Sequence, residues 1–168
     1  MPLKTEESMF FVDSMLGNIA KKLRLLGYDS QYFSDIDDKR LIDSAKKENR
    51  IIISKDEELV KKAKKLGIRS VYITKEEEID QFFEIIYFMN LKRIHINGDT
   101  ARCPKCNSLT ESIDKNINKE KIPQGVLKLN DKFWKCKCCN QIYWEGTHIK
   151  NLQEFVMNVN ERLQQFIR

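Results

Sequence analysis

The sequence predicts an α/β domain with a largely parallel sheet, followed by a cysteine-rich module and a terminal helix. Short β-branched or aromatic runs alternate with amphipathic helical segments over residues 8–89. The run IIIS at 51–54 has no polar alternation, which is typical of a parallel strand covered on both faces. All five cysteines lie between residues 101 and 150, which marks a separate module.

The predicted elements follow one another with short connections. Four segments have the strand pattern: residues 9–13, 30–33, 51–54 and 70–73. Each is followed by apolar residues at helical spacing: residues 15–26, the stretch after SDIDD (34–38), residues 57–66 and residues 75–89. Gly27 and Gly67 end two of these helices, and Thr74 with Glu77 predicts a capping box for the fourth.

We expect three units, at residues 1–94, 101–150 and 151–168, with a linker near HINGD (95–99). The last unit is one amphipathic helix. Its apolar face carries Leu152, Phe155, Val156, Val159, Leu163 and Phe166. This face is expected to pack on one of the other two units; the alternative is a contact with a second copy of the chain or with a partner protein.

The positive charge is concentrated in the cysteine-rich segment. Residues 101–150 carry 10 Lys or Arg against 5 Asp or Glu, whereas residues 1–100 carry 18 of each. A local basic surface favours a polyanionic partner such as RNA, although a solubilising lysine-rich face gives the same count. No apolar run approaches the roughly 20 residues of a membrane span, and the N-terminus does not resemble a signal peptide. We therefore expect a cytoplasmic protein without membrane contact.

Acidic residues follow three of the predicted strands. Asp13 ends the first strand, Asp37 and Asp38 begin the second helix, and Asp56 follows the third strand by two residues. Ligands of parallel α/β sheets bind at the carboxyl ends of the strands, so these acids are candidates for an Mg²⁺ or Mn²⁺ site. Asp37 or Asp38, and Asp56, also have a structural explanation as residues that cap or open a helix, whereas Asp13 is harder to explain in this way because it directly follows MFFV. A phosphoacceptor role for Asp56 is disfavoured, because an acidic pair would then have to end the first strand.

The cysteines form two C-x2-C pairs, CPKC (103–106) and CKCC (136–139), separated by 29 residues. The four thiolates of Cys103, Cys106, Cys136 and Cys139 predict one structural zinc ion in a zinc ribbon. The spacer exceeds the usual length of about 15 to 20 residues, which indicates an inserted loop. Pairing Cys136 with Cys138, a disulfide and a redox C-x-x-C motif are the less favoured alternatives.

Trp134, Tyr143 and Trp144 flank the second pair among lysines. They suit either stacking on RNA bases or the small core of the ribbon, and we favour the core for at least two of them. His148 is a fifth potential zinc ligand, but four thiolates already complete a tetrahedral site, and we favour a non-ligand role.

The motifs DSMLGNIAKKLRLLGYD (13–29), DDKRLIDSAKKENRIIISKD (37–56), the two C-x2-C pairs and YWEGTH (143–148) resemble the mut-seven C-terminal ribonuclease family, within the PIN-like nucleases. The resemblance covers roughly residues 9–150. It implies a PIN-like three-layer nuclease domain and makes Asp13, Asp38 and Asp56 the catalytic Mg²⁺ or Mn²⁺ ligands, with Asp37 as a close substitute for Asp38. It also implies that Ser54 holds a carboxylate or water. Glu57 and Glu76 are the only guesses for a fourth acid.

Two functional hypotheses follow. The first is a metal-dependent ribonuclease whose basic ribbon helps to bind RNA. Its expected RNA-binding residues are Lys128, Lys132, Lys135 and Lys137 of the ribbon, with Lys21 and Arg24 of the first helix. The second is a non-catalytic RNA- or protein-binding module in which the acids are helix caps and the zinc ribbon is structural.

Overall fold

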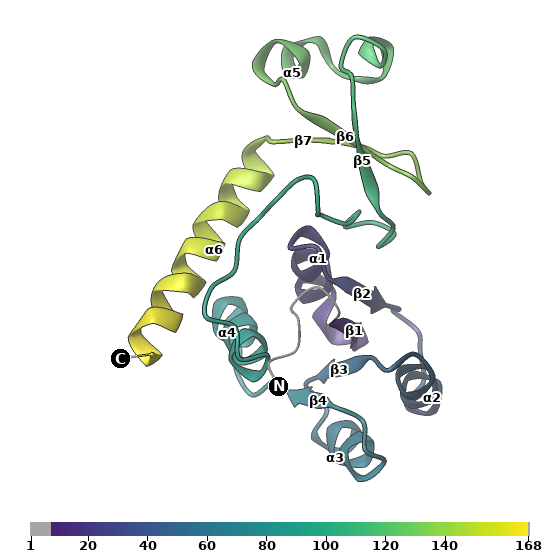
Figure 1. The fold of residues 1–168 in the computed structure, drawn as a ribbon. Helices are drawn as coiled ribbons and strands as arrows, with labels where there is room; N and C mark the ends of the chain where they lie inside the picture. Colours follow the sequence, from purple (N-terminus) through teal and green to yellow (C-terminus); the bar gives the residue numbers. More distant parts are fainter. Residues whose placement is uncertain (1–7, 168) are drawn as a thin grey trace.

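The computed structural model describes residues 8–167, which form two β-sheets (Figure 1). The first seven residues of the predicted 1–94 unit lie outside this range. The first sheet is parallel, in the order β2-β1-β3-β4, and consists of β1 (Met9–Val12), β2 (Asp29–Tyr32), β3 (Ile51–Ser54) and β4 (Ser70–Tyr72). The second is antiparallel, in the order β5-β6-β7, and consists of β5 (Thr110–Ile113), β6 (Phe133–Cys136) and β7 (Ile142–Trp144).

Helices cover both faces of the parallel sheet, as the sequence predicts. The short 3-10 turn η1 (Ser14–Leu16) leads from β1 into α1, which packs with α4 and α6 on one face. Helices α2 and α3 cover the other face (Figure 1). The bounds of these helices are α1 (Gly17–Leu25), α2 (Asp38–Glu48), α3 (Glu57–Lys65), α4 (Glu78–Phe88) and α6 (Thr147–Phe166). The predicted α/β class with a three-layer parallel-sheet domain is confirmed.

Strand side chains alternate between the two layers. Phe10 and Val12 of β1 enter the core beneath α1 and α4, whereas Phe11 points to α2 and α3. In β3, Ile53 lies in the first of these cores and Ile52 in the second. Both faces therefore require apolar residues, which explains why IIIS shows no polar alternation.

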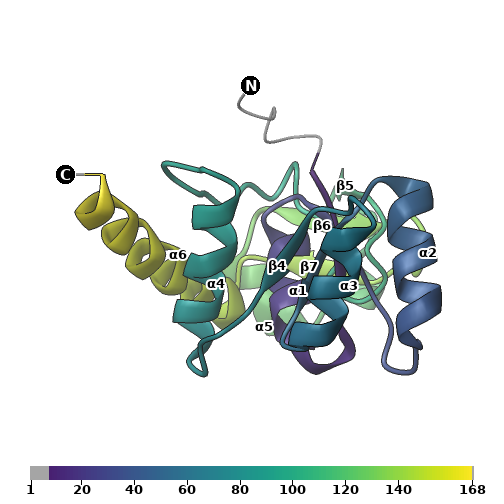
Figure 2. The ribbon, with the colours of Figure 1, turned by 90° about the horizontal axis from the view of Figure 1, so that it is seen from below.

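Helix α6 packs against the α/β unit through its apolar face. Val156, Val159 and Leu163 join the core that contains α4, and Figure 2 shows the two helices side by side. The side-chain amide of Asn160 donates to the carbonyl of Ile94 and accepts from its N–H, each at 2.9 Å. The terminal helix therefore packs on the α/β unit, as expected. None of the described helices combines the length and the apolar character needed to cross a bilayer.

The capping box predicted for α4 is wrong. The helix begins at Glu78, and its N-cap Glu77 makes no side-chain capping bond. Thr74 lies too far before the helix to cap it. Its backbone N–H donates to Glu84 Oε2 at 3.0 Å, and its hydroxyl donates to the same carboxylate. Thr74 is therefore bonded to Glu84, in the second turn of α4, and not to Glu77 as the spacing in the sequence predicts.

The antiparallel sheet has a small core of its own. The spacer between the cysteine pairs contains β5, the 3-10 turn η2 (Lys119–Lys121) and α5 (Gln124–Leu129), so the predicted insertion is partly helical. Ile122, Phe133 and Ile142 are buried there. Trp134 is also buried, and it covers Gly98 so closely that a Cβ at residue 98 would collide with the indole. Residue 98 therefore has to be glycine.

Candidate functional site

The strand order brings the predicted acids to one edge of the sheet. Strands β2, β1 and β3 are parallel neighbours, so their carboxyl ends share that edge. The connection after β1 leads to α1 on one face, and the connection after β3 leads to α3 on the other. The two connections diverge at the β1/β3 boundary, and such switch points are where parallel α/β sheets form ligand crevices. Asp13 and Asp56 lie at this boundary.

The hydroxyl of Ser54 links the ends of β1 and β3. It donates to Asp13 Oδ2 at 2.6 Å and accepts from the backbone N–H of Asp56 at 2.9 Å. The other oxygen of Asp13 accepts from the N–H of Ser14 at 2.6 Å, and the N–H of Asp13 donates to the carbonyl of Ile53 at 2.9 Å. Ser54 is fully buried. The carboxylate of Asp13 is therefore held in one orientation at the strand end.

Two of the acids also cap α-helices, and Asp13 is the N-cap of the 3-10 turn η1. Asp56 is the N-cap of α3, and its Oδ1 accepts from the N–H groups of Glu58 and Leu59 at 2.9 and 3.1 Å. Asp37 is the N-cap of α2 and accepts from the N–H of Arg40 at 2.9 Å. Asp38 occupies the first turn of α2, where among residues 8–167 it has no hydrogen-bonding or ion-pair partner. The structural explanation thus holds for Asp37 and for Asp56, while Asp38 has its carboxylate available.

The carboxylates share an edge without forming a closed cluster. In the described part of the chain, the four cysteines are the one group of three or more potential metal ligands drawn within 4.8 Å of one another. Glu76, one of the guesses for a fourth acid, lies beyond β4 and forms an ion pair with Lys55 at 3.0 Å. The acidic site is therefore open, with carboxylates that follow adjacent strands.

The thiols of Cys103, Cys106, Cys136 and Cys139 converge as predicted. Four sulfurs about 2.3 Å from a tetrahedral zinc would lie about 3.8 Å apart. The Sγ atoms of Cys103 and Cys139 are 3.7 Å apart and those of Cys106 and Cys136 are 3.3 Å apart. This donor set and spacing fit a zinc ion. Cys138 is exposed and outside the group, and so is His148, as the sequence predicts.

The two cysteine pairs have the same turn geometry. Each is followed by an asparagine in the left-handed conformation, Asn107 with φ 68° and Asn140 with φ 61°. The asparagine N–H donates to the carbonyl of the first cysteine of its pair, at 2.8 Å for Asn107 and 3.2 Å for Asn140. Asparagine tolerates this conformation better than most residues. The repeated C-x2-C-N pattern in the sequence is the signal that indicates this shared turn.

The thiols differ in acidity. Burial raises the pKa of Cys136 to about 12, although N–H groups of Cys138 and Cys139 donate to its sulfur. Burial also opposes ionisation of Cys106, but hydrogen bonds from Ser108 outweigh it and lower its pKa to about 6. Burial and the adjacent Cys103 sulfur, 2.9 Å from its hydroxyl, raise the pKa of Tyr143. Since zinc binds thiolates, its binding must displace protons here.

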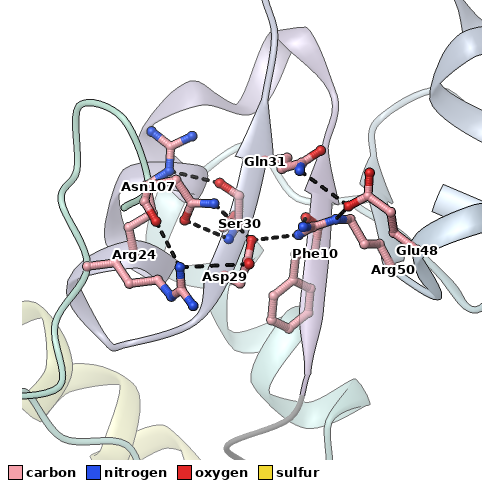
Figure 3. Close-up of polar contacts among 9 residues, drawn as sticks. Phe10, Arg24, Asp29, Ser30, Gln31, Glu48, Arg50 and Asn107 are labelled. Carbon is pink, nitrogen blue, oxygen red and sulfur yellow. Dashed lines mark hydrogen bonds and ion pairs between the residues drawn. The ribbon is translucent and has the colours of Figure 1, made fainter. Parts of the chain in front are cut away.

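The first cysteine turn is docked on the outer edge of β2 (Figure 3). The side-chain oxygen of Asn107 accepts from the N–H of Ser30 at 3.0 Å, and its Nδ2 donates to Asp29 Oδ1 at 2.8 Å. Arg24 donates from Nε to the carbonyl of Ser30 at 2.8 Å. These side chains satisfy the backbone groups that a further strand would otherwise pair, so they protect an exposed sheet edge.

Asp29 is the centre of this junction. Burial raises its pKa, but hydrogen bonds from Arg50 and Asn107, with the charges of Arg50 and Arg102, lower it below its usual value. Arg50 lies 2.6 Å from Asp29 and is itself buried, with a second ion pair to Glu48 at 2.6 Å. The carboxylate thus joins the parallel sheet to the zinc ribbon.

The expectation that Arg24 binds RNA is wrong. Its side chain is only 6% exposed, and it donates to the carbonyls of Ser30 and Pro104. Arg24 and Lys21 both follow Asp13 on one helix, but α1 turns Arg24 towards the ribbon, where it donates to Pro104. Lys21 is exposed, as are three of the ribbon lysines, Lys128, Lys132 and Lys137, while Lys135 is half-buried.

Of the three ribbon aromatics, Trp144 packs in the small core as predicted, whereas Trp134 is buried against the linker at Gly98. Trp134 is buried and donates from Nε1 to Asp99 at 3.1 Å. Trp144 packs against the small core of the ribbon, and Tyr143 contacts the sulfur of Cys103.

The sequence matches the family described as the Mut7-C RNAse domain over residues 8–156. Searches among curated proteins and among solved structures gave no match. The family match spans the parallel sheet with its acidic edge, the four-cysteine ribbon and the first half of α6. The chain therefore belongs to the Mut7-C RNAse domain family.

Proposed function

We propose that this protein is a metal-dependent ribonuclease that hydrolyses RNA phosphodiester bonds at the carboxyl edge of the parallel sheet. The observation that carries the proposal is the link between the ends of β1 and β3, where Ser54 holds the carboxylate of Asp13 beside Asp56. Membership of a family described as an RNAse domain supports the same function.

Asp13, Asp38 and Asp56 are the proposed ligands of Mg²⁺ or Mn²⁺, because oxygen donors suit these ions. We prefer Asp38 to Asp37, since Asp37 is committed to capping α2 and to Arg40. A bound divalent ion would supply activation of a water molecule and stabilisation of the leaving oxygen. Ser54 orients Asp13, and the N–H groups at the start of α3 fix one oxygen of Asp56, while its other oxygen accepts no hydrogen bond from the described residues.

The zinc ribbon is proposed to have two roles. One structural zinc ion on the four thiolates stabilises a module that has a small apolar core. Its lysines, Lys128, Lys132, Lys135 and Lys137, together with Lys21 of α1, attract the RNA backbone. A site of four zinc-bound thiolates suits a reducing compartment, so we propose a cytoplasmic location.

The test is cleavage of a mixed set of labelled RNAs by zinc-loaded protein, first without other divalent ions and then with Mg²⁺ or Mn²⁺ added. Asp13→Asn, Asp38→Asn and Asp56→Asn are compared with Asp37→Asn and with Asp43→Asn. Asp43 is an exposed acid one turn into α2, so it is the matched control for the charge change.

We expect cleavage that requires added Mg²⁺ or Mn²⁺, is lost in the first three variants and is retained in both controls. If the Asp37 variant were inactive and the Asp38 variant active, the assignment between these two acids would be reversed. RNA binding without cleavage, unchanged by Asp13→Asn, would instead support a non-catalytic RNA-binding module.

A further inference from the structure

A hollow of about 480 Å³ lies beside the acidic edge. Its wall includes Ser14, which directly follows Asp13, and Lys55, which lies between Ser54 and Asp56. Lys21 and Tyr32 contribute a cation and an aromatic ring. The volume is within the roughly 300–1,000 Å³ typical of small-ligand sites. Any chain bound across Asp13 and Asp56 would therefore have room to continue into this hollow.

The charges in the hollow are nearly balanced. Glu78 forms an ion pair with Lys22, and Glu76 forms one with Lys55 at 3.0 Å. Lys21 is exposed and, within residues 8–167, has no acidic partner. The hollow thus contains one uncompensated cation when its ion pairs are closed, and a second when the pair between Lys55 and Glu76 opens.

The two members of that pair differ in exposure. The side chain of Lys55 is 23% exposed, whereas that of Glu76 is 88% exposed. An ion pair with a highly exposed member contributes little to stability, because water solvates the carboxylate nearly as well as the ammonium group does. Glu76 can therefore be replaced at low cost by a stronger anion, and a phosphate oxygen is a suitable replacement.

We propose that the hollow is an RNA subsite, in which Lys55 and Lys21 bind a backbone phosphate next to the bond that is cut, and Glu76 occupies Lys55 when RNA is absent. This inference rests on the proposed ribonuclease function and deepens it. Glu76 acts as a competitor for the lysine, so its removal strengthens binding.

The test measures the affinity of zinc-loaded protein for a short labelled single-stranded RNA, without Mg²⁺ or Mn²⁺, as a function of salt concentration. Lys55→Met is expected to weaken binding about fivefold, near the upper limit for one partly exposed charge contact. It should also reduce the slope of log K against log salt by about 0.7, the value for one phosphate contact on a single strand. Glu76→Gln is expected to tighten binding about twofold, since it frees the same lysine.

Lys65→Met is the matched control, because Lys65 is an exposed lysine at the last residue of α3, the end of the helix away from Asp56. It should leave both affinity and salt slope unchanged. Opposite effects of the Lys55 and Glu76 variants support the subsite. Equal losses of RNA affinity in the Lys55 and Glu76 variants would show that the ion pair only stabilises the connection after β4, and would overturn the inference. Affinities equal to that of the Lys65 variant would overturn it as well.

The proposed function is tested separately on the same protein preparations by cleavage with Mn²⁺. If the parent protein cleaves RNA but the Lys55 and Glu76 variants lose affinity equally, the subsite is overturned and the proposed ribonuclease function stands. No RNA binding by the parent chain overturns the subsite and the RNA substrate together.

Discussion

The junction between the zinc ribbon and the parallel sheet gives a prediction with an internal control. Asn107 and Asn140 have the same left-handed conformation at equivalent positions of the two cysteine turns. The side chain of Asn107 makes two hydrogen bonds to β2, whereas that of Asn140 is exposed. Replacing each by glycine keeps the backbone conformation accessible, so the difference between the two variants isolates the side-chain bonds.

The magnitude follows from the two bonds. The bond from the N–H of Ser30 is between neutral groups and is worth about 1 kcal/mol. The bond to the carboxylate of Asp29 is charge-assisted and worth about 1.5 kcal/mol in this partly exposed position. Asn107→Gly should therefore lower the free energy of unfolding by about 2.5 kcal/mol more than Asn140→Gly. For a chain of this length that corresponds to about 5–10 °C in the thermal midpoint.

The assay is thermal unfolding followed by circular dichroism, with zinc content measured for each variant to show that the thiol site stays loaded. Equal midpoints for the two variants would refute the reasoning, because the bonds to β2 would then contribute nothing. A loss of zinc in the Asn107 variant alone would refute it as well, since the side chain would be stabilising the metal site and not the docking of the ribbon.

Two further predictions concern Asp29 and the thiols. The pKa of Asp29 is lowered in the folded protein, so its stabilising contribution is complete above its unfolded pKa of about 3.9 and is lost as the pH falls through the lower folded value. Asp29→Asn should therefore reduce the thermal midpoint at neutral pH and flatten its decrease below about pH 4; an unchanged acid profile would contradict the role of this carboxylate. The protein should bind one zinc ion and release protons as it does so; Cys106→Ser should lower the bound zinc, and Cys138→Ser should not. Metal analysis measures the bound zinc, and a pH indicator during zinc titration measures the released protons. Equal zinc loss in the two variants would contradict the assigned ligand set.

Local patterns predict most of the elements because they depend on near neighbours in the chain. A period of 3.6 or 2 residues, or a C-x2-C spacing, is set by backbone geometry over a few residues. The strands and helices of the α/β unit and the convergence of the four cysteines therefore agree with the structure. Spacing along the chain does not reveal the partner of Thr74, because Glu84 reaches it only through the fold of the connection after β4.

Acids after three strands, two C-x2-C pairs and a terminal helix with one apolar face are evident from the sequence alone. Three features are evident only in the folded chain: the strand order that places Asp13 and Asp56 at one switch point, the burial of Arg24 beneath the ribbon, and the packing of α6 on α4. The physical reason is that these outcomes depend on contacts between residues distant in sequence. Whether Arg24 faces solvent depends on what covers α1, and the residues that contact Arg24 there, Arg102 and Pro104, lie some 80 positions later in the chain.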